Sequence, residues 1–569
     1  MNLNVTKSDF LVQGLEEIQP AYADFNGTMY AGRLPADNGN RQGETMFWMF
    51  EPTIQLVPDT LVIWLNGGPG CSSFNCGVMM EHSPVTQPLK PAGFCCLKAN
   101  PKLEVNEHAW TRATTMLYVE HPWGTGFSYG RPEPATEIEA SGDLYAFIQN
   151  FFVVFPELAS RQLYIFGESY AGMFVPSILH FFHHENLKND KPKINIAGGA
   201  IGNGWMDPAI QGPATIDYSW WHGLIDKPTR DNLLDIWDRC ASGRGSEMKA
   251  PFHPFTVQDD CGMMWGILQA SGHPNEYDIT TMDPNVDQTT FTSEAFYNTP
   301  AVKKALHAPD DHVWHGCQWG EGRRRLLATE KHRLLYMDND RPLSMAPYIG
   351  ELLDAGIPLL VYNGDRDMTT NMVGTEMVLN TRLEWHGKGK WQDAPRGMWK
   401  SGFMTADEYT SGWAKELSGL TFVVVYNSGH MVPYNVPGPA YDLLVRFLTS
   451  KSFIDLELPQ VRSSDLVKPR QVEWMHPYPT GLSGYLHSFN DTSDLSLGRD
   501  ATVVGTPVNT YHGEAWLSIV IGLLMAFVAG LAVAVMGMHA LQRRDRRRQE
   551  KGGYTSVPDS TEDSMVQLK

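Results

Sequence analysis

A serine in the stretch IFGESYAGMF (165–174) has the surroundings of a catalytic nucleophile. Ser169 follows a short apolar run and precedes another apolar segment, which is the strand–turn–helix context of a nucleophile elbow. The small residues Ala171 and Gly172 suit the close approach of helix and strand at such a turn. A serine that only caps the following helix is the simpler alternative, because serine is a common N-cap.

An acid and a histidine follow Ser169 in the chain order of a hydrolase triad. The run NGDRDMTTN (363–371) offers Asp365 and Asp367 after one apolar run, and NSGHMVP (427–433) places His430 after the next. A single histidine after a strand is more often structural. Three such residues at strand ends, in the order serine, acid, histidine, favour acyl-transfer chemistry.

The elements that must position these residues are buried strands. Apolar runs separated by helical stretches such as 138–154 predict a parallel sheet that is covered on both faces. Working residues collect at the carboxyl ends of such strands, where this chain has Asn66, Glu120 and the three triad candidates. The predicted strands lie within 61–68, 114–122, 161–167, 194–204, 357–365 and 420–430.

The pattern along the chain predicts an α/β-hydrolase fold with an insertion and a membrane anchor. The core would comprise 1–205 and 346–452, and 206–345 would be a largely helical insertion over the strand ends. Residues 453–514 lose periodicity and resemble a lumenal stalk. Within 515–540 an uncharged apolar stretch is long enough for one transmembrane helix, and 541–569 would be a cytosolic tail.

Charge and processing signals place the body of the protein in a lumen. The arginine-rich RRDRRR (543–548) follows the apolar stretch, so the positive-inside rule puts the tail in the cytosol and predicts a single-pass type I membrane protein. The start, MNLNVTKSDFLVQG, has no apolar signal sequence, so we expect the natural chain to begin earlier. The net charge of -19 makes nucleic acid an unfavourable partner and is compatible with cationic ligands.

Sequons and cysteines agree with a lumenal body. Glycosylation is expected at Asn4, Asn26 and Asn490. All seven cysteines lie before the apolar stretch, which suits an oxidising compartment and leaves one thiol over.

Six motifs together resemble the serine carboxypeptidase family (peptidase S10) over roughly residues 25 to 450. They are WLNGGPGCSS (64–73), HPWGTGFSY (121–129), FGESYAG (166–172), GNGWMDP (202–208), NGDRDMTTN (363–371) and SGHMVP (428–433). The resemblance implies an enzyme that releases C-terminal residues through an acyl-enzyme and needs no cofactor or metal. With the anchor and tail, it is nearest to Golgi members of the family that act on precursor peptides after a dibasic-site endoprotease.

The resemblance also implies a role for individual residues. Ser169 would be the nucleophile, His430 the general base and Asp367, rather than Asp365, the acid. The oxyanion hole would be the backbone N–H groups of Gly68 and Tyr170. The terminal carboxylate of the substrate would be bound by Asn66, Gly67, Glu81 and Glu168.

Disulfides and departures from the family pattern follow from the same resemblance. It implies the pairs Cys71–Cys317 and Cys240–Cys261, and leaves Cys76, Cys95 and Cys96 without a clear pairing. The chain has Thr370 where the family usually has cysteine, and one extra residue precedes Glu81.

Glu81 and Glu168 could bind the terminal carboxylate of a substrate only if at least one of them carries a proton. Two close carboxyl groups share one, and the protonated carboxyl can donate to the substrate. We therefore expect peptide acids to bind better at mildly acidic pH.

The expected function is removal of C-terminal Lys or Arg from precursors, such as pheromone precursors, in the Golgi and trans-Golgi network. A link to programmed cell death follows from the resemblance only.

Alternative functions are those of a broad-specificity carboxypeptidase, an acyltransferase, and a sorting receptor on an inactive hydrolase fold. A zinc carboxypeptidase would have to use His273 and Glu276, which lie in a Pro/Gly-rich loop. His180, His183 and His184 share a helix face, and the simplest interpretation is a polar helix end. The oligomeric state is left open.

Overall fold

All six predicted apolar runs form the centre of one large sheet. In the computed structural model they are neighbours in the order β6-β3-β8-β9-β10-β13, and every neighbouring pair is parallel. The prediction of a buried parallel sheet is confirmed. The strands are β3 Thr60–Leu65, β6 Thr115–Val119, β8 Gln162–Glu168, β9 Ile196–Gly202, β10 Leu359–Gly364 and β13 Leu420–Val425.

The structure describes residues 5–87, 103–188, 190–241, 263–281, 293–317, 343–401 and 410–458. All of them belong to one compact unit, residues 1–468.

Antiparallel strands extend the sheet at both edges, so the sheet is mixed. The hairpin β1–β2 pairs with β6, and β12, β11 and β14 follow β13 in that order. The sequence analysis did not predict these strands, and several are too short to show a pattern of their own. The added strands are β1 Gly27–Pro35, β2 Gln42–Pro52, β7 Tyr129–Arg131, β11 Arg396–Trp399, β12 Gly412–Leu417 and β14 Leu456–Glu457, with β4 Val85–Thr86 and β5 Glu104–Val105 in a separate pair.

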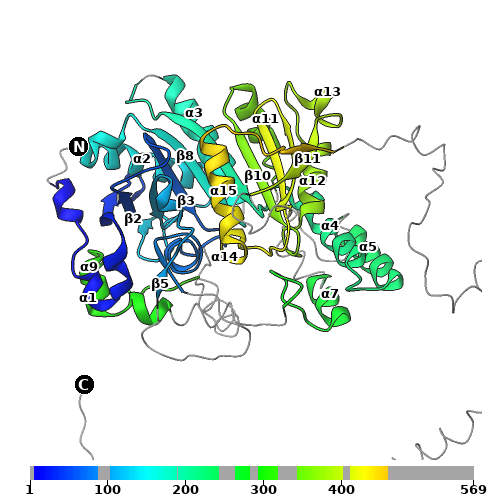
Figure 1. The fold of residues 1–569 in the computed structure, drawn as a ribbon, viewed down its shortest axis with the longest axis horizontal. Helices are drawn as coiled ribbons and strands as arrows, with labels where there is room; N and C mark the ends of the chain where they lie inside the picture. The colour runs from blue at the N-terminus through cyan, green and yellow to red at the C-terminus, as the bar shows by residue number, and fades with distance from the viewer. Residues whose placement is uncertain are drawn as a thin grey trace, which may run out of the picture. The chain divides into compact units, whose positions relative to one another are not determined.

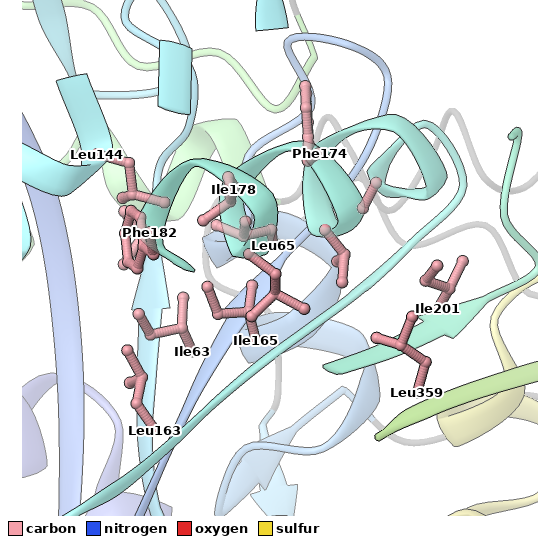
Figure 2. Packing of buried hydrophobic residues seen from close by; sticks show 14 of the residues in the cluster. Ile63, Leu65, Leu144, Leu163, Ile165, Phe174, Ile178, Phe182, Ile201 and Leu359 are labelled. Atoms are coloured by element: carbon pink, nitrogen blue, oxygen red, sulfur yellow. The ribbon is translucent and has the colours of Figure 1, made fainter. Parts of the chain in front are cut away.

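Helices cover both faces of the sheet, because alternate side chains of each buried strand point to opposite sides. Ile63 and Leu65 pack in the cluster with α2 Glu137–Val154, α3 Ala171–Lys188 and α11 Ala346–Asp354. Val62 and Trp64 of the same strand pack in the cluster with α15 Pro437–Leu448. Figure 1 shows these layers, and Figure 2 shows α3 lying over side chains of the central strands, with Phe174, Ile178, Phe182, Ile63, Leu65, Leu163, Ile165, Ile201 and Leu359 labelled.

Within the described part of 206–345 the named elements are all helices. α4 Pro208–Trp221 begins directly after the carboxyl end of β9, and α5 Lys227–Ala241 and α7 Met263–Ser271 pack near it. Their small core includes Trp237 and also Met368, which follows β10. The insertion therefore contacts the strand ends from which the candidate acid projects.

The remaining helices are short or lie at the edges of the core. They are α1 Leu15–Ile18, α9 Pro300–Ala305, α12 Met372–Thr381, α13 Lys388–Trp391, α14 Val432–Asn435, the 3-10 helices η1 Lys7–Phe10, η2 Pro20–Asp24, η4 Trp110–Arg112 and η5 Pro156–Leu158, and the π-helix η3 Phe74–Glu81.

Several predictions concern residues outside the described ranges. Asn4, Asn490, Cys95, Cys96, Cys261 and the segments 459–514, 515–540 and 541–569 lie there, and so does the side chain of Cys240. Among the helices that the structure describes, none has the length and apolar character to cross a membrane. Asn26 is exposed just before β1, where a glycan could attach.

Candidate active site

Ser169 occupies a sharp turn between β8 and α3. Its backbone φ is +64°, a left-handed value that is uncommon for a residue with a side chain. Its N–H donates to the carbonyl of Gly202, and its carbonyl accepts from the N–H groups of Gly172 and Trp205. A Cβ added to Gly172 would lie 2.6 Å from Trp205 N, so only glycine fits there. The turn has the geometry that an elbow nucleophile requires and differs from an ordinary helix cap.

His430 and Asp367 form a hydrogen-bonded pair at the ends of β13 and β10. His430 Nδ1 lies 2.8 Å from Asp367 Oδ2, and the Asp367 side chain is fully buried. Asp365 has a different partner, since its Oδ1 accepts from the N–H of Ser428 at 3.2 Å. Of the two aspartates, Asp367 is therefore the one that orients the imidazole.

Two further residues hold the acid, and the sequence analysis assigned a role to neither. Asn203 Nδ2 and Thr370 Oγ1 each donate to Asp367 Oδ2 at 2.8 Å. Thr370 Oγ1 also lies 3.2 Å from His430 Nδ1. Asn203 follows Gly202, the residue that accepts from the Ser169 backbone, and thus links the serine turn to the acid. The signal for Asn203 was its place in GNGWMDP, directly after a strand.

The glycine-rich loop after β3 lies against the serine turn. A Cβ added to Gly67 would lie 2.3 Å from Tyr170 N and 2.8 Å from Ser169 Cβ. Gly68 has a φ of +115°, and its N–H has no hydrogen-bond partner among the described residues. The backbone N–H groups of Gly68 and Tyr170 thus belong to two segments in close contact beside Ser169, as an oxyanion hole would require.

A disulfide fastens this loop to the insertion. Cys71 and Cys317 are bonded, and the N–H of Ser72 donates to the carbonyl of Gly316 at 2.8 Å. The expected Cys71–Cys317 pair is confirmed. The link holds the glycine loop in place although its partner is distant along the chain.

Two buried acids and an amide lie directly beside Ser169. Asn66 Nδ2 is 2.8 Å from Glu168 Oε1 and 3.4 Å from Glu81 Oε1. Trp64 Nε1 donates to Asn66 Oδ1 at 2.8 Å, which fixes the orientation of the amide. Glu81 and Glu168 are only 2% and 4% exposed, so Glu168 is not a solvated helix-start acid.

Burial and proximity favour the protonated form of these acids. Burial raises the pKa of Glu81 to about 7. Burial, and then the charge and hydrogen bond of Glu81, raise the pKa of Glu168 well above its usual range. At mildly acidic pH the pair is therefore neutral and can donate hydrogen bonds to an anion.

The π-helix η3 brings Glu81 to this position. The N–H groups of Val78 and His82 donate to carbonyls five residues earlier, those of Ser73 and Gly77. A π-turn holds one residue more than an α-turn, which fits a segment with an extra residue before Glu81. The free thiol of Cys76 lies in the same helix, within 4.8 Å of the carboxyl oxygens of Glu81 and Glu168.

Glu120, at the end of β6, holds neighbouring loops and lies outside the group around Ser169. Its Oε1 accepts from Ser72 Oγ at 2.5 Å and from Trp314 Nε1 at 2.8 Å, and its Oε2 accepts from the N–H of Phe127. Burial raises the pKa of Glu120 to about 7.

The zinc-peptidase alternative gains no support from the structure. Among the described residues, His273 and Glu276 belong to no group of three side chains close enough to share a metal ion.

Comparisons with known proteins identify the family. The family model for serine carboxypeptidase, peptidase S10, matches residues 20–450. Serine carboxypeptidase S10 family member 2 of Dictyostelium discoideum is 32% identical over 80% of this chain and 78% of that protein. Pheromone-processing carboxypeptidase kex1 of Aspergillus terreus is 31% identical over 74% of this chain and 66% of that protein.

A solved structure agrees with these relatives. The crystal structure of Kex1Δp, a prohormone-processing carboxypeptidase from Saccharomyces cerevisiae, matches with a TM-score of 0.64 and 25% identity, over 78% of this chain and 96% of that one. The chain belongs to the serine carboxypeptidase family, peptidase S10.

Proposed function

We propose that this carboxypeptidase removes C-terminal Lys and Arg residues from precursor peptides in the lumen of the late secretory pathway. The observation that supports removal of the last residue is the buried pair Glu81–Glu168. Asn66 contacts both carboxyl groups, and Glu168 directly precedes Ser169 in the chain. A neutral acid pair and an amide can accept a terminal carboxylate, whereas an internal peptide segment has no such group to place there.

In the proposed reaction Ser169 attacks the carbonyl of the last peptide bond. His430 takes the hydroxyl proton and gives it to the departing amino acid, while Asp367 holds the imidazole through Nδ1. The N–H groups of Gly68 and Tyr170 stabilise the oxyanion, and each such donor contributes about 3 kcal/mol to transition-state stabilisation. Water activated by His430 then releases the shortened peptide from Ser169.

The preference for basic leaving residues is supported by charge near the histidine. The ring of Tyr277 lies 4.9 Å from that of His430, and Glu276 and Asp278 flank it. The N–H of His430 donates to the carbonyl of Tyr277, so this acidic segment borders the site. The net charge of -19 acts in the same direction at longer range.

The cellular setting is proposed from the same sources. Relatives named pheromone-processing and prohormone-processing carboxypeptidases support precursor peptides as substrates. The apolar stretch within 515–540 and the basic segment after it support a type I anchor in the Golgi or trans-Golgi network membrane. Participation in programmed cell death has no support of its own in the site.

Amino-acid release from matched peptides ending in Arg, Lys, Leu or Phe tests the proposal. We expect kcat/KM to be highest for Arg and Lys, and all release to disappear in Ser169→Ala. Replacing Glu276 by Gln and Asp278 by Asn should reduce the basic preference and leave release after Leu unchanged. Equal or faster release after Leu and Phe by the unmodified chain would leave a carboxypeptidase of broad specificity.

A further inference from the structure

Two histidines of α3 and one glutamate of α11 converge at a point that the peptidase reaction does not use. His180 and His184 lie one turn apart on α3, and their Nε2 atoms are 3.1 and 2.5 Å from the two carboxylate oxygens of Glu351. The sequence suggested only a polar helix end, because Glu351 is far away along the chain.

The three ligand atoms already have the spacing of a metal site. They all lie within 4.8 Å of one another. Zinc binds imidazole nitrogen and carboxylate oxygen at about 2.0–2.2 Å, so neighbouring ligand atoms of a tetrahedral site are separated by about 3.3 Å. The distance from His180 Nε2 to Glu351, 3.1 Å, is near this value, and that from His184 Nε2, 2.5 Å, is shorter, so the side chains of His184 and Glu351 would move apart to admit an ion.

The surroundings hold one imidazole in place. The ring of His180 stacks on that of Tyr348, with centroids 4.2 Å apart and an interplanar angle of 19°. The side chain of His180 is 17% exposed, whereas those of His184 and Glu351 are 46% and 47% exposed. One ligand is therefore fixed by packing, and the other two leave the fourth position open to water.

We propose that His180, His184 and Glu351 bind one Zn²⁺ ion that links α3 to α11. Two imidazoles and one carboxylate are a ligand set that suits zinc. Binding requires that both Nε2 atoms carry no proton and that the Glu351 carboxylate is ionised. His180 Nδ1 is buried without a hydrogen-bond partner among the described residues, so we expect a weaker affinity than that of a dedicated structural site.

The ion would stabilise the fold without entering the reaction. α3 begins just after Ser169, and α11 precedes β10, after which Asp367 follows. The bridge would thus join the two parts of the hydrolase core on either side of the insertion. Because only the folded chain brings the three ligands together, zinc should raise the unfolding temperature in a concentration-dependent way.

Zinc titration of the full chain, first stripped with a chelator, tests the proposal. We expect binding measured by calorimetry and a rise in the unfolding temperature. His184→Ala and Glu351→Gln should each weaken binding at least about tenfold. Both side chains are largely exposed, so the variants should fold. His183→Ala is the matched control, because His183 is adjacent but outside the group, and its zinc affinity should equal that of the unmodified chain.

A second group, Cys76 with Glu81 and Glu168, could also attract zinc, and Cys76→Ala separates the two sites. Binding and the temperature rise should persist in Cys76→Ala and weaken when His184→Ala is added to that variant. Undiminished zinc affinity in His184→Ala, or no rise in unfolding temperature in the unmodified chain, would overturn the proposal.

Discussion

If the acid pair Glu81–Glu168 binds the terminal carboxylate as proposed, substrate binding should depend on pH in a predictable direction. Burial raises the pKa of Glu81 to about 7, and burial together with the neighbouring Glu81 raises the pKa of Glu168 well above its usual range. The terminal carboxylate of a peptide is ionised throughout this range. As the pH rises through about 7, the pair gains a negative charge and repels the substrate it had bound.

The size of the effect follows from the pKa of Glu81. If only the neutral pair binds, the dissociation constant is multiplied by one plus the ratio of ionised to neutral Glu81. For a pKa of about 7 this factor is near one at about pH 5 and roughly ten at about pH 8. A tenfold loss corresponds to about 1.4 kcal/mol of binding free energy.

The assay must separate binding from catalysis, because a change of pH can also alter the rate of the chemical step. We would measure the dissociation constant of a fluorescent peptide acid on Ser169→Ala, which binds but does not cleave. Glu81→Gln is the matched variant: it keeps a hydrogen-bond donor and removes the titrating group. For Ser169→Ala we expect a roughly tenfold rise in the dissociation constant from about pH 5 to about pH 8. For the double variant Ser169→Ala/Glu81→Gln we expect no change over this range.

Two results would refute this reasoning. A flat profile in Ser169→Ala would show that no acid near the substrate titrates in this range. An unchanged slope after Glu81→Gln would show that a different group titrates. A peptide with an amidated C-terminus should show no such slope with either variant.

Three further predictions concern catalysis and stability. Asp367→Asn should lower kcat on the order of ten-thousand-fold, whereas Asp365→Asn, whose carboxylate does not contact His430, should change it far less in the same peptide assay. Replacing Cys71 and Cys317 by Ser should lower the free energy of unfolding by about 2–5 kcal/mol in urea denaturation, and an unchanged midpoint would contradict this. The folded-state pKa of Glu120 is raised from 4.5 to about 7, so its contribution is fully present below about pH 4.5 and is lost as the pH rises through about 7. Glu120→Gln should therefore remove a pH-dependent part of the unfolding free energy of about 2 kcal/mol, measured between about pH 5 and about pH 7.5.

The sequence by itself determined the elements and the type of chemistry. Buried strands are apolar on both faces, so all six central strands could be predicted from local composition. Ser169 and His430 lie next to such strands, and their order along the chain predicted a hydrolase. The Cys71–Cys317 pair followed from the family motifs, since neither spacing nor composition fixes a pairing over so long a separation.

Only the tertiary structure decided which distant side chains meet. The hydrogen bond from Asn203 to Asp367 depends on β9 and β10 being neighbours in the sheet. The close approach of Glu81 to Glu168 depends on how the π-helix η3 turns over the end of β8. Glu351 meets His180 only because α11 packs beside α3. Local sequence patterns indicate whether each segment is buried. Hydrogen bonds and ion pairs between segments depend on how segments that are distant in the sequence pack together.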